Sequence, residues 1–153
     1  MRRTMLFLPG NTPNMLINGD TLGADTVIFD LEDAVSPDEK DAARILVHNA
    51  LKYQSFAGCE VVVRINPTDT EFWKEDLEEV IPLKPDMIMP TKVSGKQMIR
   101  EVSDYMSQVE EKNGLEKGSV KILPLIETAL GVEMAYEIAS ADQRVPGLFL
   151  GGE

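Results

Sequence analysis

Short runs of apolar residues alternate with amphipathic segments along the whole chain. Six runs rich in β-favouring residues predict strands at residues 5–8, 26–29, 61–67, 87–90, 122–126 and 148–150. Segments with helical periodicity or helix start signals lie between them, at residues 13–16, 36–53, 71–80, 98–113 and 132–140. Strict alternation of this kind predicts an α/β fold in which parallel strands are joined by right-handed crossovers.

The second predicted helix has the clearest start signal in the chain. Ser36 can act as the N-cap, Pro37 suits the first helical position, and Glu39 completes a capping box. Thr12 and Pro13 suggest a similar start for the first helix. The face of the second helix expected to pack inward consists of Ala42, Ile45, Leu46 and Ala50.

Three carboxylates follow the second strand within four positions. Asp30, Glu32 and Asp33 come directly after the run 26–29. Binding sites in α/β folds assemble at the carboxyl ends of parallel strands, because the loops and helix N-termini point there. We therefore interpret these acids as holding a cation or positioning a cationic group. The alternative is that they only cap the loop and the next helix.

Other strands bring polar residues toward the same edge. Arg64 interrupts the apolar third strand, and a guanidinium there needs an anionic partner from the protein or from a ligand. The structural alternative is an ion pair with an acid that follows the second strand. Glu127 ends the fifth strand, and Lys92 and Lys96 follow the fourth. We expect Asp30 or Glu32, Arg64 and Glu127 to face one cavity.

Composition restricts the classes of function. The formal net charge of −11 argues against general nucleic-acid binding, which requires a basic surface. No apolar run is long enough for a membrane span, and no signal peptide is recognisable. The single Cys59 excludes an internal disulfide and is consistent with a reducing cytoplasm. The length of 153 residues suits a single domain, residues 1–153.

Several motifs together resemble one known family. They are RTMLFLPG at 3–10, DLEDAV at 30–35, KDAAR at 40–44, VRIN at 63–66, IET at 126–128 with Gly131, and LGGE at 150–153. In this combination and order the chain resembles the citrate lyase β-subunit family, within the wider group of citryl-CoA and malyl-CoA lyases. The resemblance implies a (β/α)8 TIM barrel about twice this length. The chain would then be an incomplete barrel of about six βα units, truncated at its C-terminal end.

The resemblance also implies roles for individual residues. Arg64 matches a substrate-binding arginine, and Glu127 matches a glutamate that binds Mg²⁺ and contacts substrate. A second metal ligand would be an aspartate one residue beyond Glu153. From the residues themselves, Glu32 and Asp33 are candidates to contact substrate or to support the metal through water. Many relatives have Pro-Lys after the fourth strand, whereas this chain has Pro90-Thr91-Lys92.

The implied activity is cleavage of a citryl thioester, citryl-acyl-carrier protein, to oxaloacetate and an acetyl thioester. This retro-Claisen step suits carboxylate-bound Mg²⁺ and a fixed guanidinium. Citramalyl or malyl thioesters are alternative substrates, and a non-catalytic fragment or assembly subunit is an alternative role. A phospho-acceptor domain would need acids on the first strand and a lone aspartate on the third, where the chain has Arg64.

The resemblance implies an acyl carrier protein and other citrate lyase subunits as partners, in a homo-oligomer or a multi-subunit complex. Because acyl carrier proteins are acidic, docking would need a local basic patch, for which Lys92 and Lys96 are the candidates. With one metal ligand and two unpaired strand edges, the isolated 153-residue chain is expected to be inactive.

Overall fold

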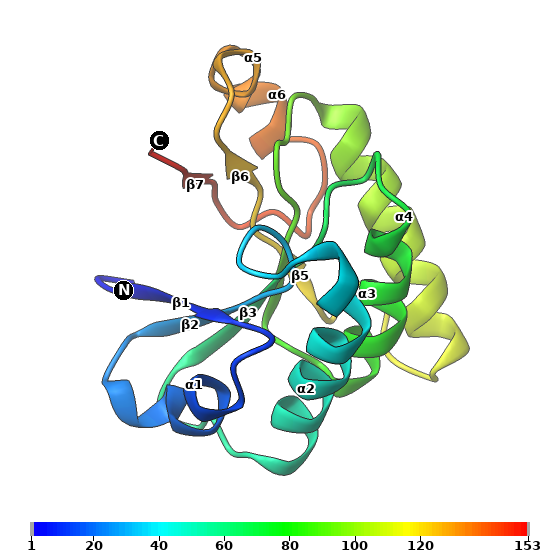
Figure 1. The fold of residues 1–153 in the computed structure, drawn as a ribbon. Coiled ribbons are helices and arrows are strands. Elements are labelled where there is room, and N and C mark those ends of the chain that lie inside the picture. The colour runs from blue at the N-terminus through cyan, green and yellow to red at the C-terminus, as the bar shows by residue number, and fades with distance from the viewer. Residues whose placement is uncertain (1, 153) are drawn as a thin grey trace.

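The computed structural model describes residues 2–152, and all its strand pairs are parallel. The first sheet has the order β1-β2-β3-β4-β5, and β6 pairs with β7 in a second sheet (Figure 1). The strands are β1 (Met5–Pro9), β2 (Thr26–Asp30), β3 (Glu60–Arg64), β4 (Met87–Met89), β5 (Lys121–Ile122), β6 (Leu125–Ile126) and β7 (Phe149–Leu150). Strands and helices alternate as the sequence predicts.

A proline divides the predicted fifth strand, residues 122–126, into β5 and β6. Pro124 has no N–H group with which to continue a ladder. The backbone nevertheless stays beside β4, because Leu123 N donates to Ile88 O at 2.8 Å and Leu125 N donates to Pro90 O at 3.0 Å. β6 therefore continues the strand series and pairs with β7 on its other side.

Three longer helices cover one side of the strands, whereas both ends of the chain lie on the other side (Figure 1). These helices are α2 (Lys40–Tyr53), α3 (Phe72–Val80) and α4 (Lys96–Lys112). The shorter α-helices are α1 (Pro13–Asn18), α5 (Ala129–Glu133) and α6 (Ala135–Ala139). The 3-10 turns are η1 (Gly19–Leu22), η2 (Pro37–Glu39) and η3 (Ile81–Leu83). The predicted helix 132–140 thus begins earlier and is divided at Met134.

The predicted helix caps differ from those observed. Ser36 precedes a 3-10 turn, and its hydroxyl donates to Glu39 Oε2 at 3.2 Å instead of accepting a backbone hydrogen bond. Within the described residues, Thr12 also makes no side-chain cap. Thr128, which the sequence analysis did not select as a cap, accepts a hydrogen bond from Gly131 N at 3.0 Å.

The buried face of α2 is also displaced from the predicted one. Ala43, Val47 and Ala50 are buried, whereas Ile45 is 57% exposed. The prediction of Ala42 and Ile45 as inward positions was therefore wrong. Periodicity alone did not identify the face, because apolar residues occur on more than one side of this helix.

The apolar core has two parts. The larger part lies between the sheet and the helices and includes Phe29, Val63, Trp73 and Ile99. The smaller part lies on the opposite side of the strands and contains Ile28, Val62, Met87, Met89, Leu123 and Leu125. On that side Phe7 and Phe149 meet edge to face with ring centroids 6.0 Å apart, so the first and last strands both contribute to it.

No helix within residues 2–152 is long and apolar enough to span a membrane. Cys59 is a free thiol.

Candidate functional site

The carboxyl ends of β2 and β3 are joined by a fork-like ion pair. Asp30 and Arg64 are register partners in adjacent strands. Arg64 Nε donates to Asp30 Oδ1 at 2.7 Å, and Arg64 Nη2 donates to Asp30 Oδ2. The Asp30 side chain is buried, with an exposed fraction of 2%, and the Arg64 side chain is partly buried, with an exposed fraction of 12%. Arg64 therefore makes the structural ion pair that the sequence analysis named as its alternative.

Asp30 also shapes the acidic turn, which we define as residues 31–34. Its Oδ1 accepts a hydrogen bond from Glu32 N at 2.8 Å, and its Oδ2 accepts one from Ala34 N at 3.2 Å. Asp30 therefore caps the loop that follows β2, which is the alternative role that the sequence left open for these acids. Asp33 lies at the rim of this turn with its side chain 63% exposed.

Glu32 is a buried carboxylate between two cations. Its Oε1 accepts a hydrogen bond from Lys92 Nζ at 3.0 Å, and its Oε2 lies 3.3 Å from Arg64 Nη1. Burial raises the pKa of Glu32, and the charges of Lys92 and Arg64 act in the opposite direction. No described residue donates a hydrogen bond to Oε2.

The Nη1 nitrogen of Arg64 is still available as a hydrogen-bond donor. Among the described residues Nη1 donates no hydrogen bond; the nearest carboxylate oxygens are those of Glu32 at 3.3 Å and Asp33 at 4.0 Å. The guanidinium carbon lies 4.9 Å from the centroid of the Phe7 ring. The group is thus fixed through Nε and Nη2, whereas Nη1 can still bind an anion.

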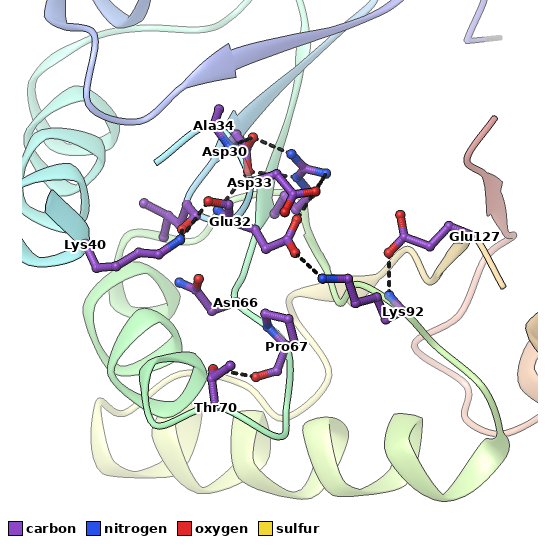
Figure 2. Close-up of polar contacts among 12 residues, drawn as sticks. Asp30, Glu32, Asp33, Ala34, Lys40, Asn66, Pro67, Thr70, Lys92 and Glu127 are labelled. Atoms are coloured by element: carbon purple, nitrogen blue, oxygen red, sulfur yellow. Dashed lines mark hydrogen bonds and ion pairs between the residues drawn. The ribbon is translucent and has the colours of Figure 1, made fainter. Parts of the chain in front are cut away.

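Lys92 links the acidic turn to Glu127. Figure 2 shows Lys92 between Glu32 and Glu127, and its backbone N donates to Glu127 Oε1 at 2.7 Å. Lys92 has a φ of 53°, the left-handed conformation that residues other than glycine rarely adopt. Such outliers are found preferentially at functional sites.

The two lysines expected to form a basic docking patch are both paired. Lys92 Nζ contacts Glu32, as described, and Lys96 Nζ lies 3.0 Å from Glu137 Oε2 on α6. Neighbouring carboxylates therefore offset the charge of both ammonium groups, and the role of the two lysines in docking stays a prediction. About half of each side chain remains exposed.

Glu127 is the described residue best suited to ligate a metal ion. Its Oε1 accepts the hydrogen bond from Lys92, and no described residue donates one to its Oε2. A carboxylate oxygen is a ligand that Mg²⁺ prefers, and this ion is commonly held by one or two carboxylates together with water and substrate. Glu127 therefore fits as one ligand. Within residues 2–152 no three His, Cys, Asp or Glu side chains form a metal-binding group, and Glu153 lies outside that range.

A hollow adjoins the acidic turn on the side of α2. Its lining includes Glu32, Asp33, Lys40, Asn66, Pro67 and Thr70, most of which come from the loops after β2 and β3 (Figure 2). Lys40 lies at this hollow, and no role for it is predicted from the sequence. A signal was available, since a lysine in the first turn of a helix is electrostatically disfavoured.

The structure thus brings Asp30, Glu32, Arg64, Lys92 and Glu127 together at the carboxyl ends of four strands. They form a continuous series of polar contacts, from Asp30 through Arg64, Glu32 and Lys92 to Glu127. This cluster has two cations, Arg64 and Lys92, and two carboxylates, Glu32 and Glu127, that each have an oxygen to which no described residue donates a hydrogen bond. Such a site can bind an oxyanion and a divalent cation side by side.

Comparisons with known proteins identify relatives of the chain. The family model described as HpcH/HpaI aldolase/citrate lyase matches residues 3–153. The citrate lyase subunit β of Leuconostoc mesenteroides subsp. cremoris is 42% identical over the whole chain, and a (3S)-malyl-CoA thioesterase of Cereibacter sphaeroides is 35% identical over 97% of it. The citrate lyase β subunit of Mycobacterium tuberculosis, solved with oxaloacetate and magnesium, superimposes with a TM-score of 0.74 at 28% identity over 96% of the chain.

The chain spans about half the length of the relatives it matches. It covers 51% of the Leuconostoc protein, 48% of the Cereibacter protein and 56% of the M. tuberculosis structure. The predicted fold class, an α/β fold forming part of a TIM-type barrel, is confirmed by the parallel strands and by these likenesses.

Proposed function

Because the chain belongs to the HpcH/HpaI aldolase/citrate lyase family, we propose that it forms part of an Mg²⁺-dependent carbon–carbon lyase. The proposed substrate is a citryl thioester carried by an acyl carrier protein, and the products are oxaloacetate and an acetyl thioester. The names of the Leuconostoc and M. tuberculosis relatives support this choice.

The observation that carries the proposal is the fixed guanidinium of Arg64 with Nη1 still able to donate. Asp30 holds Nε and Nη2, so the orientation of the group is set before any ligand arrives. A preorganised cation of this kind binds a substrate carboxylate or a developing oxyanion without the cost of reorganising. Glu32 and Asp33, next to Nη1, are proposed to contact substrate or water at the same place.

The proposed reaction is a retro-Claisen cleavage. The substrate hydroxyl loses its proton and becomes the keto group of oxaloacetate. The bond from the carbinol carbon to the α-carbon of the thioester breaks, and its electron pair forms the enolate of the acetyl thioester, which is then protonated. The positive charges of Arg64 and Lys92 favour the anionic species in this sequence. Glu127 would hold Mg²⁺, which when bound supplies a Lewis acid that acidifies the hydroxyl.

Other lyase subunits and the carrier protein are proposed as partners, by analogy with the subunit names of the relatives. The alternative substrate is a malyl or citramalyl thioester, and the similarity to the Cereibacter (3S)-malyl-CoA thioesterase supports the malyl thioester. A non-catalytic assembly role is the second alternative. Residues 1–153 alone are proposed to lack turnover, because a barrel site draws residues from several strands.

The test is thioester cleavage by the complete natural polypeptide that contains this chain, with and without Mg²⁺. We expect Mg²⁺-dependent release of oxaloacetate from citryl thioester. Arg64→Lys should lower kcat/KM by about 10²–10³, since a point charge replaces the planar fork. Arg100→Lys, at an exposed position of α4, is the matched control. Parental turnover in Arg64→Lys would show that Arg64 has only a structural role, and cleavage of malyl or citramalyl thioesters alone would favour the alternative substrates.

A further inference from the structure

Lys40 stands in an unfavourable place for a lysine. It is the first residue of α2, where the helix dipole is positive, and it is only 7% exposed. Burial lowers the pKa of Lys40, although surrounding carboxylates such as Asp76 and Glu32 oppose that shift. A buried ammonium is costly unless hydrogen bonds compensate for its lost hydration. The hydrogen bonds of Lys40 therefore show which groups compensate for the burial of its ammonium.

The ammonium of Lys40 bonds to the backbone of the acidic turn. Its Nζ donates to Leu31 O at 2.7 Å and to Glu32 O at 2.6 Å. Both are short charge-assisted hydrogen bonds. The two carbonyl groups belong to the peptide units immediately before and after the Cα atom of Glu32. Lys40 therefore fixes the backbone on both sides of Glu32, and with it the direction in which the Glu32 side chain leaves the chain.

The direction of the Glu32 side chain determines its contacts at the site. From this backbone position its carboxylate reaches Lys92 Nζ at 3.0 Å and Arg64 Nη1 at 3.3 Å. Asp30 supports the same turn through the amide nitrogens of Glu32 and Ala34. The turn is thus held by a carboxylate on its N–H groups and by an ammonium on its carbonyl groups.

We propose that Lys40 is a positioning residue for the site: it clamps the two peptide units that flank Glu32 and so keeps the Glu32 carboxylate against Arg64 and Lys92. The effect on turnover rests on the proposed function. The effect on the conformation of the turn does not, and can be measured without any substrate.

The next turn of α2 supports the neighbouring loop in a related way. Arg44 Nε donates to Asp76 Oδ1 at 3.1 Å. Asp76 Oδ2 in turn accepts hydrogen bonds from Asn66 N at 3.0 Å and Asn66 Nδ2 at 2.8 Å. The two basic residues of the KDAAR segment therefore act on the loops after β2 and β3. This agrees with a role for the start of α2 in holding the rim of the site.

The first experiment is hydrogen exchange of the backbone amides in the complete natural polypeptide. Lys40→Met keeps a buried apolar stem and removes the ammonium, and Lys52→Met, at an exposed position of the same helix, is the matched control. We expect exchange of the amides of residues 31–34 to accelerate about tenfold in Lys40→Met and to stay unchanged in the control. If Lys40→Met unfolds, Lys40→Gln should show a smaller acceleration in the same amides. Unchanged exchange in a folded Lys40 variant would overturn the proposal.

The second experiment measures turnover and its coupling to Glu32. We expect kcat/KM to fall about 10²-fold in Lys40→Met, the loss that misplacement of a site residue by about 1 Å can cause, and to recover in large part in Lys40→Arg. Glu32→Gln should have little further effect in the Lys40→Met background, since interacting residues are not additive. A purely structural role would give additive effects, and these would contradict the proposal.

These outcomes separate the two proposals. Absence of Mg²⁺-dependent thioester cleavage by the complete natural polypeptide would remove the proposed function and leave the exchange result intact. A large loss in Arg64→Lys with parental kcat/KM in Lys40→Met would instead support the lyase site and reject the positioning role of Lys40.

Discussion

The ammonium of Lys92 lies 3.0 Å from the Oε1 atom of Glu32, although 60 residues separate the two in the chain. Glu32 follows β2 and is 4% exposed at its side chain, whereas Lys92 follows β4 and is 53% exposed. The backbone N of the same lysine donates to Glu127 after β6. One residue thereby connects two carboxylates from non-adjacent strands, one through its side chain and the other through its backbone.

Removing the ammonium of Lys92 should raise the pKa of Glu32 further. Burial already raises this pKa, and Lys92 is the largest influence that lowers it. A carboxyl whose folded-state pKa is raised contributes stability below its unfolded pKa, and that contribution is lost as the pH rises through the folded value. In Lys92→Met the folded-state pKa of Glu32 is raised further, so this contribution to stability should be lost over a pH range that extends to higher values. The measurement is the free energy of unfolding by denaturant from about pH 4 upward.

Two controls belong with this experiment. Lys112→Met removes an exposed lysine at the end of α4 and should leave the pH profile unchanged. Glu32→Gln in the Lys92→Met background should abolish the added pH dependence. A profile for Lys92→Met parallel to that of the parent would show that Lys92 does not stabilise the ionised form of Glu32.

Glu127→Gln should weaken Mg²⁺ binding under the proposed function. An amide keeps the shape of the side chain but removes the negative charge that attracts the ion. We expect the affinity to fall by more than the roughly 10- to 100-fold that loss of an outer-shell partner causes. Titration calorimetry of the complete natural polypeptide measures the affinity, with Glu133→Gln on the exposed side of α5 as control. Equal affinities in the parent and in Glu127→Gln would exclude Glu127 as a ligand.

A buried ion pair away from the site should dominate the response of the fold to acid. Arg144 Nη1 and Nη2 donate to the two carboxylate oxygens of Glu110 at 2.9 and 2.6 Å, and Glu110 is fully buried. Burial would raise the pKa of Glu110, but the hydrogen bonds from Arg144 and from the backbone N–H groups of Gly118 and Val120 outweigh burial and lower it to about 2. The stabilisation is present above the unfolded pKa of about 4.5 and is lost as the pH falls toward 2.

Glu110→Gln should therefore destabilise the protein by about 3–5 kcal/mol at neutral pH, because it leaves a guanidinium buried without its counter-charge. The difference from the parent should shrink as the pH falls below about 4.5. Glu111→Gln, at the adjacent exposed position, should change stability by less than about 0.5 kcal/mol. A destabilisation that does not vary with pH would contradict the assignment of charge to Glu110.

Much of the site could be located from the sequence because strand ends are locally encoded. An apolar run followed by Asp30, Glu32 and Asp33 marks the end of β2, and Arg64 and Glu127 end later runs in the same way. Parallel strands place such ends at one edge, so the grouping follows from the alternation itself. The partners of these side chains could not be predicted, because the pairing of Arg64 with Asp30 depends on the register of two strands 34 residues apart.

The sequence by itself determined the order of strands and helices and the positions at which charged residues follow the strands. Both depend on local properties, namely the periodicity of apolar residues and the chemistry of turns. Only the tertiary structure decided which face of α2 is buried, that Lys92 turns toward Glu32, and that Lys40 reaches back to the carbonyls of Leu31 and Glu32. These choices are made by packing and by the need of every buried charge for a partner, and that partner is supplied by whichever segment the fold brings near.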